Sequence, residues 1–462
     1  MKYLNKTFRL LCCFIVAIGY VFSQEITVRD SKTSVSLSDV YIYNEAKTKS
    51  IITDSEGRAS LSNFSTNEKV YFQLLGYQLL EFELSEFLND SFEIYLDLKS
   101  QILEEVILSV ARSESNANQI AEKVSVIKAE DLYLTAPASS AEVLELSPGV
   151  RIQKSQGGGG SPVIRGFEAN RVLIVVDGVR MNNAIYRSGH LQNSITIDPN
   201  NIDRVEIIYG SSSVGYGSDA LGGVVHYYTK TPTLKDSIKV KSSFSSNFNT
   251  VNSSLSNSFS TNYSEENWGF FSTISISKFG NIKMGQRRQH GYENWGLNNY
   301  YSENSRYKFK ENPSPNNDPN LQQNTGYSQV DFFQKFLFKL PYQKLLNINI
   351  QYSESSDIDR YDKLSEGINN ELKFSEWYYG PQKRLLISPS LKFFSQKPLL
   401  KRGRITLAYQ MAEESRINRK FNSIVRSSQL EKINILSLNG DFDTSFDRGH
   451  ALSYGIEGTL NN

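Results

Sequence analysis

The fold is decided by Ser161-Pro162-Val163-Ile164-Arg165-Gly166-Phe167 and Val172-Leu173-Ile174-Val175-Val176-Asp177-Gly178-Val179-Arg180. Two further runs follow, Ile202-Asp203-Arg204-Val205-Glu206-Ile207-Ile208-Tyr209-Gly210 and Tyr216-Gly217-Ser218-Asp219-Ala220-Leu221-Gly222-Gly223-Val224-Val225-His226. Short runs of β-branched residues are separated by glycine turns, and an arginine or an acidic residue stands beside each turn. The pattern predicts a small domain of short strands joined by tight turns.

These four motifs, in this order, resemble the plug domain of TonB-dependent outer-membrane receptors. The resemblance implies that a large transmembrane barrel follows the plug. The residues to which it gives a structural role are Arg165, Gly166, Asp177, Gly178, Arg204, Glu206, Gly210, Tyr216, Gly217, Gly222 and Gly223. We expect the charged motif residues, with Arg180 and Asp219, to form salt bridges within the plug or to the barrel wall. A direct role in ligand binding is the alternative.

The N-terminus predicts a secretory signal peptide over residues 1–23. Lys2, Lys6 and Arg9 precede an apolar stretch, Leu10–Phe22, that is too short for a membrane-spanning helix. The only two cysteines lie inside this stretch. A lipoprotein anchor on one of them is the weaker alternative, because both lie within the apolar run rather than at its end. The mature chain would then have no disulfide and no cysteine-ligated metal.

Composition narrows the class of protein. Lysine and arginine number 50 against 49 acidic residues, so the net charge of +1 gives no reason to expect nucleic acid. The aromatic share is 12%, while the mean hydropathy is −0.40. A barrel strand facing lipid places half of its residues in a polar interior, so this combination suits an outer-membrane barrel. A secreted β-sandwich has a similar composition.

Residues 24–100 predict a small β-sandwich. Its expected strands are Val40–Tyr43, Ile51–Thr53, Val70–Leu74 and Phe92–Leu96, with a turn at Asp54-Ser55-Glu56-Gly57. That turn and Leu75-Gly76-Tyr77 resemble the non-catalytic carboxypeptidase-regulatory-like domain that precedes the plug in many receptors. An unrelated small sandwich is the alternative.

Residues 101–112 resemble a TonB box and linker. An extended apolar segment between polar flanks suits strand addition by a partner, which here would be TonB with its inner-membrane energising complex. The residues expected to bind it are Glu105, Val106, Ile107, Leu108, Ser109 and Val110. The last strand of the preceding sandwich is the alternative interpretation.

The plug is expected over residues 113–232. Val124–Ile127 reads as a strand, and Ser139-Ser140-Ala141-Glu142 resembles a capping box that opens a short helix through Leu146. The run Gly157–Gly160 is not followed by the Gly-Lys-Ser/Thr of a phosphate-binding loop. We therefore expect a flexible plug loop there.

Residues 233–462 predict the N-terminal part of a transmembrane β-barrel. Apolar and polar residues alternate over about ten positions, for example from Leu346 to Tyr352 and from Ile405 to Met411. Polar insertions at 282–325 and 357–381 are expected to be long outer loops. The alternation gives about nine strands, whereas a plugged transporter has about 22. We therefore expect the chain to be part of a longer protein that does not function alone.

One loop suggests a ligand. Gly189-His190-Leu191, followed by Ile197-Asp198-Pro199, resembles a plug loop that carries an axial haem ligand in haem and haemoglobin receptors, although Gln192-Asn193 stands where that loop has a single Asn. The resemblance implies haem-iron coordination by His190, and neutral imidazole is a common ligand of haem iron. Tyr186 and Arg187 lie in the same loop, and His290 is the candidate second ligand from the barrel. An ordinary loop histidine is the alternative.

The sequence gives no support for catalysis. No nucleophile elbow or zinc-binding His-Glu-x-x-His motif occurs, and the mature chain has four histidines. We expect a mainly β, non-enzymatic receptor in the cell outer membrane with no permanent cofactor. It would import haem, or haem from haemoglobin, by energised transport. The alternatives are a ferric-siderophore receptor and an oligosaccharide importer paired with a surface lipoprotein.

Overall fold

The computed structural model describes most of the chain after the predicted signal peptide. Its described residues are 25–31, 33–65, 67–74, 77–84, 93–97, 106–107, 115–116, 122–185, 194–368, 371–397, 399–446 and 450–462. The chain divides into two compact units, one up to Val106 and one from Ile107. None of the helices in these ranges is long and apolar enough to cross a membrane.

The first unit is built from two small sheets around one core. One sheet has the order β4-β1-β7 and the other β3-β2-β5-β6. Ile26, Val28, Ile42, Val70 and Phe72 are fully or almost fully buried in their common core. The strands are β1 (Glu25–Asp30), β2 (Tyr41–Asn44), β3 (Ser50–Ile52), β4 (Arg58–Ser60), β5 (Lys69–Gln73), β6 (Leu80–Glu83) and β7 (Glu93–Leu96). The four strands expected from the sequence are present within one or two residues.

The turn expected at Asp54–Gly57 is also present. The Asp54 carboxylate accepts hydrogen bonds from the backbone N–H groups of Arg58 and Glu56, and Gly57 has a φ of 74°. These backbone hydrogen bonds, with the nearby Arg58 guanidinium, lower the pKa of Asp54. Glycine is needed here because a Cβ would lie 2.7 Å from the Val28 carbonyl oxygen.

The second unit begins with a small α+β domain, for which we keep the name plug (residues 122–231). Its central sheet has the order β10-β15-β16-β13-β14, in which only β13 and β16 run parallel. Apolar side chains cover both faces of this sheet. The strands of the plug are β10 (Lys123–Lys128), β11 (Val150–Gln153), β12 (Ser161–Ile164), β13 (Val172–Val176), β14 (Val179–Arg180), β15 (Ile202–Tyr209) and β16 (Gly223–Thr229). Its helical segments are α2 (Ala129–Thr135), α3 (Ser140–Val143), η3 (Leu144–Leu146), η4 (Ala169–Arg171), η5 (Ser194–Thr196), η6 (Pro199–Asn201), α4 (Ser213–Tyr216) and η7 (Ser218–Ala220).

Local chemistry explains the plug motifs. Asp177 and Gly178 join β13 to β14 with φ angles of 48° and 87°, so both occupy the left-handed region that a two-residue hairpin turn requires. The expected capping box is half formed at α3: the Ser139 hydroxyl accepts from the Glu142 N–H, whereas the Glu142 carboxylate accepts from the N–H of Ala138, one residue before the N-cap. These motifs therefore fix a chain reversal and a helix start.

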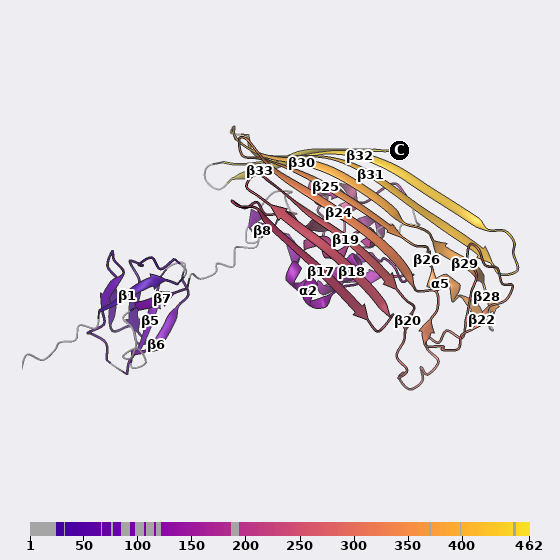
Figure 1. Cartoon of the computed structure of the whole chain (residues 1–462), viewed down its shortest axis with the longest axis horizontal. Helices are drawn as coiled ribbons and strands as arrows, with labels where there is room; N and C mark the ends of the chain where they lie inside the picture. The colour runs from indigo at the N-terminus through magenta and orange to yellow at the C-terminus, as the bar shows by residue number, and fades with distance from the viewer. Residues whose placement is uncertain are drawn as a thin grey trace, which may run out of the picture. The chain divides into compact units, whose positions relative to one another are not determined.

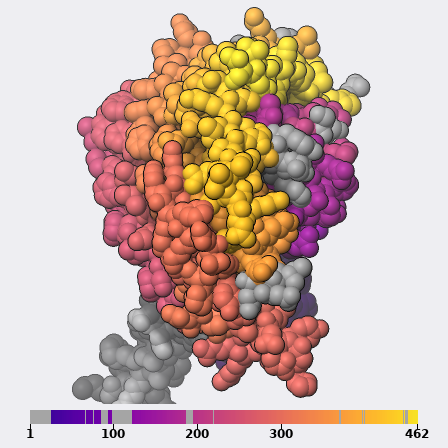
Figure 2. Space-filling model, turned by 90° about the vertical axis from the view of Figure 1, so that its right-hand side faces the viewer, coloured from indigo at the N-terminus to yellow at the C-terminus, as the bar shows by residue number. Residues whose placement is uncertain are grey.

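Nine long antiparallel strands follow the plug in the described part of the chain and lie side by side (Figure 1). All nine strands belong to one continuous sheet. They are β17 (Lys239–Asn249), β18 (Ser254–Ser264), β19 (Trp268–Phe279), β24 (Tyr327–Leu340), β25 (Lys344–Ser355), β30 (Lys383–Lys397), β31 (Leu400–Lys420), β32 (Ser427–Ser445) and β33 (Ala451–Asn461). In Figure 2 these strands, rose to yellow, form a wall against which the purple and magenta atoms of the plug lie. The expectation of about nine strands is confirmed.

The two faces of this wall have opposite character. On β31, Thr406, Ala408 and Gln410 are at most 3% exposed and face the plug, whereas Leu407 is 50% exposed on the other face. The same inversion occurs on β32, where Asn439 is buried and Leu438 is exposed. Polar residues inside and apolar residues outside are the pattern of a wall that faces lipid.

The connections differ between the two ends of the wall. Short turns at 265–267 and 341–343 lie at one end, and the insertions after β19 and β25 lie at the other. The first insertion contains β20 (Ile282–Lys283), β21 (Tyr300–Tyr301), β22 (Ser314–Pro315) and β23 (Leu321–Gln322), and the second contains β26 (Ile358–Asp359), α5 (Tyr361–Leu364), β27 (Gly367–Ile368), β28 (Glu371–Leu372) and β29 (Phe374–Tyr379). The prediction of a loop over all of 357–381 is wrong in one respect. Strand β29 pairs with the end of β31, because β31 extends 21 residues and would otherwise leave its edge unpaired.

Candidate functional site

The plug meets the wall most closely at the turn Asp177–Arg180. The ammonium group of Lys335, on β24, lies 3.0 Å from the Asp177 carboxylate and also donates to the Thr229 carbonyl and the Thr231 hydroxyl. The side-chain amide of Asn349, on β25, donates to the same carboxylate at 2.8 Å. Lys335 is 1% exposed. A buried lysine of the wall is therefore neutralised by a plug carboxylate.

Three more strands hold the same turn. The Asn439 amide on β32 donates to the Gly178 carbonyl at 2.9 Å, and the Gln410 amide on β31 donates to the Arg180 carbonyl at 3.0 Å. The Arg180 guanidinium pairs with Glu457 on β33 at 3.1 Å and with Asp219 of the plug at 2.9 Å. One four-residue turn thus receives polar contacts from five strands, β24, β25, β31, β32 and β33. We call this turn, Asp177–Arg180, the anchor turn.

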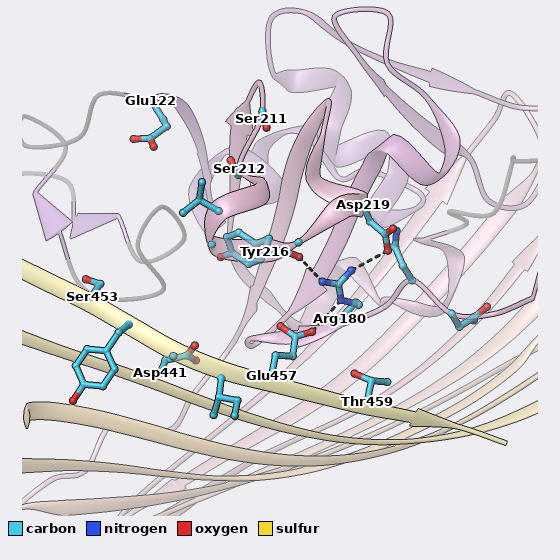
Figure 3. Close-up of a pocket in the computed structure, with 18 of the residues that line it drawn as sticks. Glu122, Arg180, Ser211, Ser212, Tyr216, Asp219, Asp441, Ser453, Glu457 and Thr459 are labelled. Atoms are coloured by element: carbon cyan, nitrogen blue, oxygen red, sulfur yellow. Dashed lines mark hydrogen bonds and ion pairs between the residues drawn. The ribbon is translucent and has the colours of Figure 1, made fainter.

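A cavity of about 890 Å³ lies beside the anchor turn, between the plug and β33. In Figure 3, Arg180 projects between Tyr216 and Asp219 of the plug and Glu457 of the wall, with dashed lines marking its contacts. Asp441 and Ser453 line the opposite side of the cavity. Its lining mixes polar and apolar side chains and contains both signs of charge.

A buried histidine supports the anchor turn from inside the plug. The Gly178 N–H donates to His226 Nε2 at 3.0 Å, so this nitrogen carries no proton and the neutral ring is protonated at Nδ1. Nδ1 faces the hydroxyls of Tyr228 and Tyr216, at 3.1 and 3.4 Å, and the ring stacks on Tyr228. The neutral tautomer is thereby set by the turn that the histidine supports.

The remaining charged motif residues make their contacts within the plug. Arg204 donates to the fully buried Glu206 at 2.8 Å and stacks on the Tyr228 ring at 4.2 Å. Arg165 lies over the Tyr209 ring at 4.8 Å. Ion pairs are therefore present for five of the charged motif residues, Asp177, Arg180, Arg204, Glu206 and Asp219. Arg165 makes a cation–π contact instead.

The Asp-Pro step of the sequence also joins the plug to the wall. Asp198 caps η6 and accepts hydrogen bonds from Asn200 and Asn201, and the Ser275 hydroxyl of β19 donates to it at 2.6 Å. Burial raises the pKa of Asp198, against these hydrogen bonds, which favour the charged form. Lys230 lies nearby and donates to the Asn200 carbonyl; burial lowers its pKa.

The glycine run is packed rather than free. Gly158–Gly160 are buried, and a Cβ on Gly157 would lie 1.9 Å from the carbonyl oxygen of Thr325, in the connection that leads into β24 of the wall. A Cβ on Gly158 would crowd Ile195, Tyr327 and Ile358, which belong to one apolar cluster. The expectation of a flexible loop is corrected: these glycines allow the β11–β12 connection to pack closely against the wall.

The predicted ligand-binding residues are not brought together among the described residues. Tyr186, Arg187 and His190 lie outside them. His290 is fully exposed on the insertion after β19, where its Nδ1 lies 3.2 Å from the Glu293 carboxylate. The described ranges contain no group of three or more histidine, cysteine, aspartate or glutamate side chains suited to a metal ion.

The predicted TonB box is described at two positions only. Val106–Ile107 form the short strand β8, which pairs with β9 (Ser115–Asn116). Glu105, Leu108, Ser109 and Val110 lie outside the described residues. The extended conformation expected for this segment is present at Val106 and Ile107.

Several contact residues of the wall were not singled out from the sequence. Lys335, Asn349, Gln410, Asn439 and Glu457 are spread over five strands. A signal did exist, because Lys335 stands at a position of β24 that the alternation turns toward the plug. A charged residue at an inward position needs a partner there. The sequence does not say which plug residue that partner is.

Comparisons with known proteins agree with this architecture. A family model described as TonB-dependent Receptor Plug Domain matches residues 116–224. The Vitamin B12 transporter BtuB of Vibrio vulnificus is 36% identical over 126 residues, which are 27% of this chain and 20% of the transporter. The Hemin receptor of Yersinia enterocolitica is 33% identical over 132 residues, 28% of this chain and 19% of the receptor. The match thus spans about a fifth of each curated relative.

Solved structures show the same fold over a larger part of the chain. A mutant of the ferric enterobactin receptor PfeA of Pseudomonas aeruginosa has a TM-score of 0.55 at 18% identity, over 77% of this chain and 50% of that chain. The copper transporter OprC has a TM-score of 0.55 at 13% identity, over 73% and 46%. At this identity the likeness concerns the fold alone. These matches show that residues 116–224 are a plug domain of the TonB-dependent receptor family, and that the plug and the wall together have the fold of part of such a receptor.

Proposed function

We propose that this protein imports a scarce ligand across the outer membrane by energised transport. The observation that supports this most directly is the attachment of the plug. Its anchor turn is held by hydrogen bonds and ion pairs from five strands, whereas apolar clusters that join plug and wall, such as Val179 with Leu386 and Ala408, are small. Such polar contacts hold the plug inside a barrel, and they can be broken one after another when the plug is pulled.

Energy would reach the plug through TonB, acting on Glu105–Val110. Strand addition needs free backbone donors, and proline has none. We expect Val106→Pro and Ile107→Pro to leave ligand binding intact and to abolish uptake. Val106→Ala is the matched control, because it keeps the backbone N–H. Undiminished uptake by both proline variants would show that TonB engages the chain elsewhere.

For the ligand we propose haem, bound by His190 of the plug. The Gly189-His190-Leu191 loop supports this, as does the similarity to a protein named as a hemin receptor. His190→Ala should weaken haem binding and change the Soret spectrum of the complex, because an iron–imidazole bond is lost. His290→Ala tests the second candidate ligand, and His450→Ala, between β32 and β33, is the control. An unchanged spectrum in the His190 variant would exclude this coordination.

Cobalamin is a second candidate, because the B12 transporter is similar at 36% identity over the plug. A ferric siderophore is the third. Binding titrations with haem, cyanocobalamin and a ferric catecholate separate the three on wild-type protein. If cyanocobalamin alone binds, the haem proposal fails and the cobalamin proposal replaces it.

A further inference from the structure

Arg384 is a buried cation that has no acidic partner among the described residues. It lies on β30 at a position that faces the plug and is 6% exposed. One guanidinium nitrogen, Nη2, donates to the Gln410 side-chain carbonyl at 3.1 Å. The other, Nη1, makes no hydrogen bond in the described part of the chain.

This arrangement differs from that of other buried cations of the wall. Lys335 and Arg419 are also buried, but Lys335 pairs with Asp177 and Arg419 pairs with Glu376 at 3.1 Å. An unpaired charge in a dry interior is strongly unfavourable, because the water lost on burial is not replaced. A counter-charge at Arg384 would remove most of that penalty.

Arg384 lines a small cavity between the plug and the wall. The cavity has a volume of about 40 Å³, which exceeds the roughly 10–15 Å³ that one water needs. Ile174 and Met181 of the plug and Ala412 of the wall make part of it apolar. The cavity is therefore large enough for a small ion or a single carboxylate group and too small for a whole transported ligand.

A second donor reaches the same cavity from the plug. The hydroxyl of Ser194 is buried and lies beside the Tyr227 hydroxyl without a hydrogen bond of ordinary geometry. A guanidinium N–H and a hydroxyl O–H are thus available in the lining, and both suit an anion. Glu414 of β31 lines the cavity as well, so the competing occupant is a water molecule between Glu414 and Arg384.

We propose that Arg384 and Ser194 form a buried binding site for one small anion, either a free halide or a carboxylate group. The guanidinium supplies the charge and one hydrogen bond, and the serine hydroxyl supplies a second from the plug. The anion joins β30 to the plug at Ser194. Its source is the surrounding solution or a carboxylate of the transported ligand, and the latter case rests on the proposed function.

The first test uses the purified protein without any transported ligand. Its unfolding temperature is measured in sodium chloride, bromide or formate and in sodium gluconate, whose anion is too large for the cavity, at equal ionic strength. Small anions should raise the unfolding temperature of wild type by a few degrees. Arg384→Gln should abolish the difference, whereas Arg402→Gln should retain it, because Arg402 pairs with Asp443 at 2.6 Å.

Crystals of wild type soaked in bromide provide a measurement that needs no variant. An anomalous peak within hydrogen-bond distance of Arg384 Nη1 supports the proposal. Equal unfolding temperatures in all four salts, an anion effect that persists in Arg384→Gln, or a site that holds only water would overturn it.

Haem and its dimethyl ester distinguish the two sources of the anion, because the ester has no free carboxylate. If Arg384→Gln weakens the binding of haem but not of the ester, the site takes a ligand carboxylate. If it affects neither while the salt effect is present, the site takes a free anion. Absence of haem binding to wild type would contradict the proposed ligand and leave the anion site supported by the first test.

Discussion

Lys335 shows at the scale of one residue how the plug is held. Its buried ammonium group lies among the Asp177 carboxylate, the Thr229 carbonyl and the Thr231 hydroxyl. Asp177 accepts in addition from the Thr229 N–H and hydroxyl and from Asn349. The ion pair therefore belongs to a network that satisfies both of its charges.

Removing one partner of this pair should destabilise the protein strongly. We expect Lys335→Met to lower the free energy of unfolding by about 3–5 kcal/mol, because the Asp177 carboxylate remains buried without its counter-charge. Urea unfolding in lipid vesicles measures this change. The double variant Lys335→Met with Asp177→Asn should recover part of the loss, because no charge is left unpaired. Additive losses in the double variant would contradict the assigned pairing.

Glu68 gives a pH-dependent contribution in the first unit. The backbone N–H of Ser65, the Asn44 amide and the Lys49 ammonium lower the pKa of Glu68 to about 2 from 4.5. Because the folded-state pKa is depressed, this contribution is present above pH 4.5 and is lost as the pH falls toward 2.

We expect Glu68→Gln to remove that part of the pH dependence. Denaturation of the first unit, followed by NMR signals of Ile42 and Val70 between about pH 2 and 6, measures it. Glu83→Gln, on an exposed side chain of β6, is the matched control. A variant whose stability falls with acid as steeply as that of wild type would contradict the role given to Glu68.

At the scale of the element, the connection between β11 and β12 shows why glycine is required. Backbone atoms as well as side chains pack against this connection, because the carbonyl oxygen of Thr325 lies where the Cβ of a residue at position 157 would be. Pairing of Val150 with Ile164 and of Gln153 with Ser161 fixes the hairpin, so the loop has little freedom to retreat.

Gly157→Ala should therefore strain the contact between plug and wall. We expect a loss of about 1–3 kcal/mol in the free energy of unfolding, which is typical of overpacking. Gly285→Ala is the matched control, because nothing lies within 4 Å of its Cβ position. Urea unfolding of both variants tests this, and equal stability of the two would show that the loop can move away.

At the scale of the whole molecule, the wall is organised for lipid on one side and the plug on the other. The wall also carries a cluster of aromatic side chains near the short turns, formed by Tyr263, Trp268, Phe270, Phe336 and Phe338. Aromatic girdles of this kind mark the membrane interface of outer-membrane barrels. The apolar band of β31 and β32 then lies within the membrane.

A charge on this band should impair insertion. We expect Leu407→Lys to cost about 2–4 kcal/mol, the usual penalty for lysine near the bilayer midplane. Val425→Lys, in the exposed connection between β31 and β32, should have little effect. Folding into vesicles, followed by the heat-dependent gel shift of folded barrels, compares the two. Normal insertion of the Leu407 variant would contradict the lipid-facing assignment.

Much of this architecture can be predicted from the sequence, because its signals are local. Hairpin turns such as Asp177-Gly178 need two neighbouring residues that tolerate positive φ, and the alternation on β25 and β31 needs only neighbours two positions apart. Plug, wall and first unit could therefore be placed before any contact was known. The packing of Gly157–Gly160 could not, because a glycine run reads alike whether it is free or enclosed.

Only the tertiary structure decided which side chains meet across the interface. Asn349 and Asp177 are 172 residues apart, and Arg180 and Glu457 are 277 apart. Such pairings depend on the tilt and register of the strands around the plug, and a sequence pattern with a period of two residues contains neither. The same is true of Arg384. Its inward position follows from the alternation in the sequence. Its lack of an acidic partner among the described residues follows from the placement of the neighbouring strands.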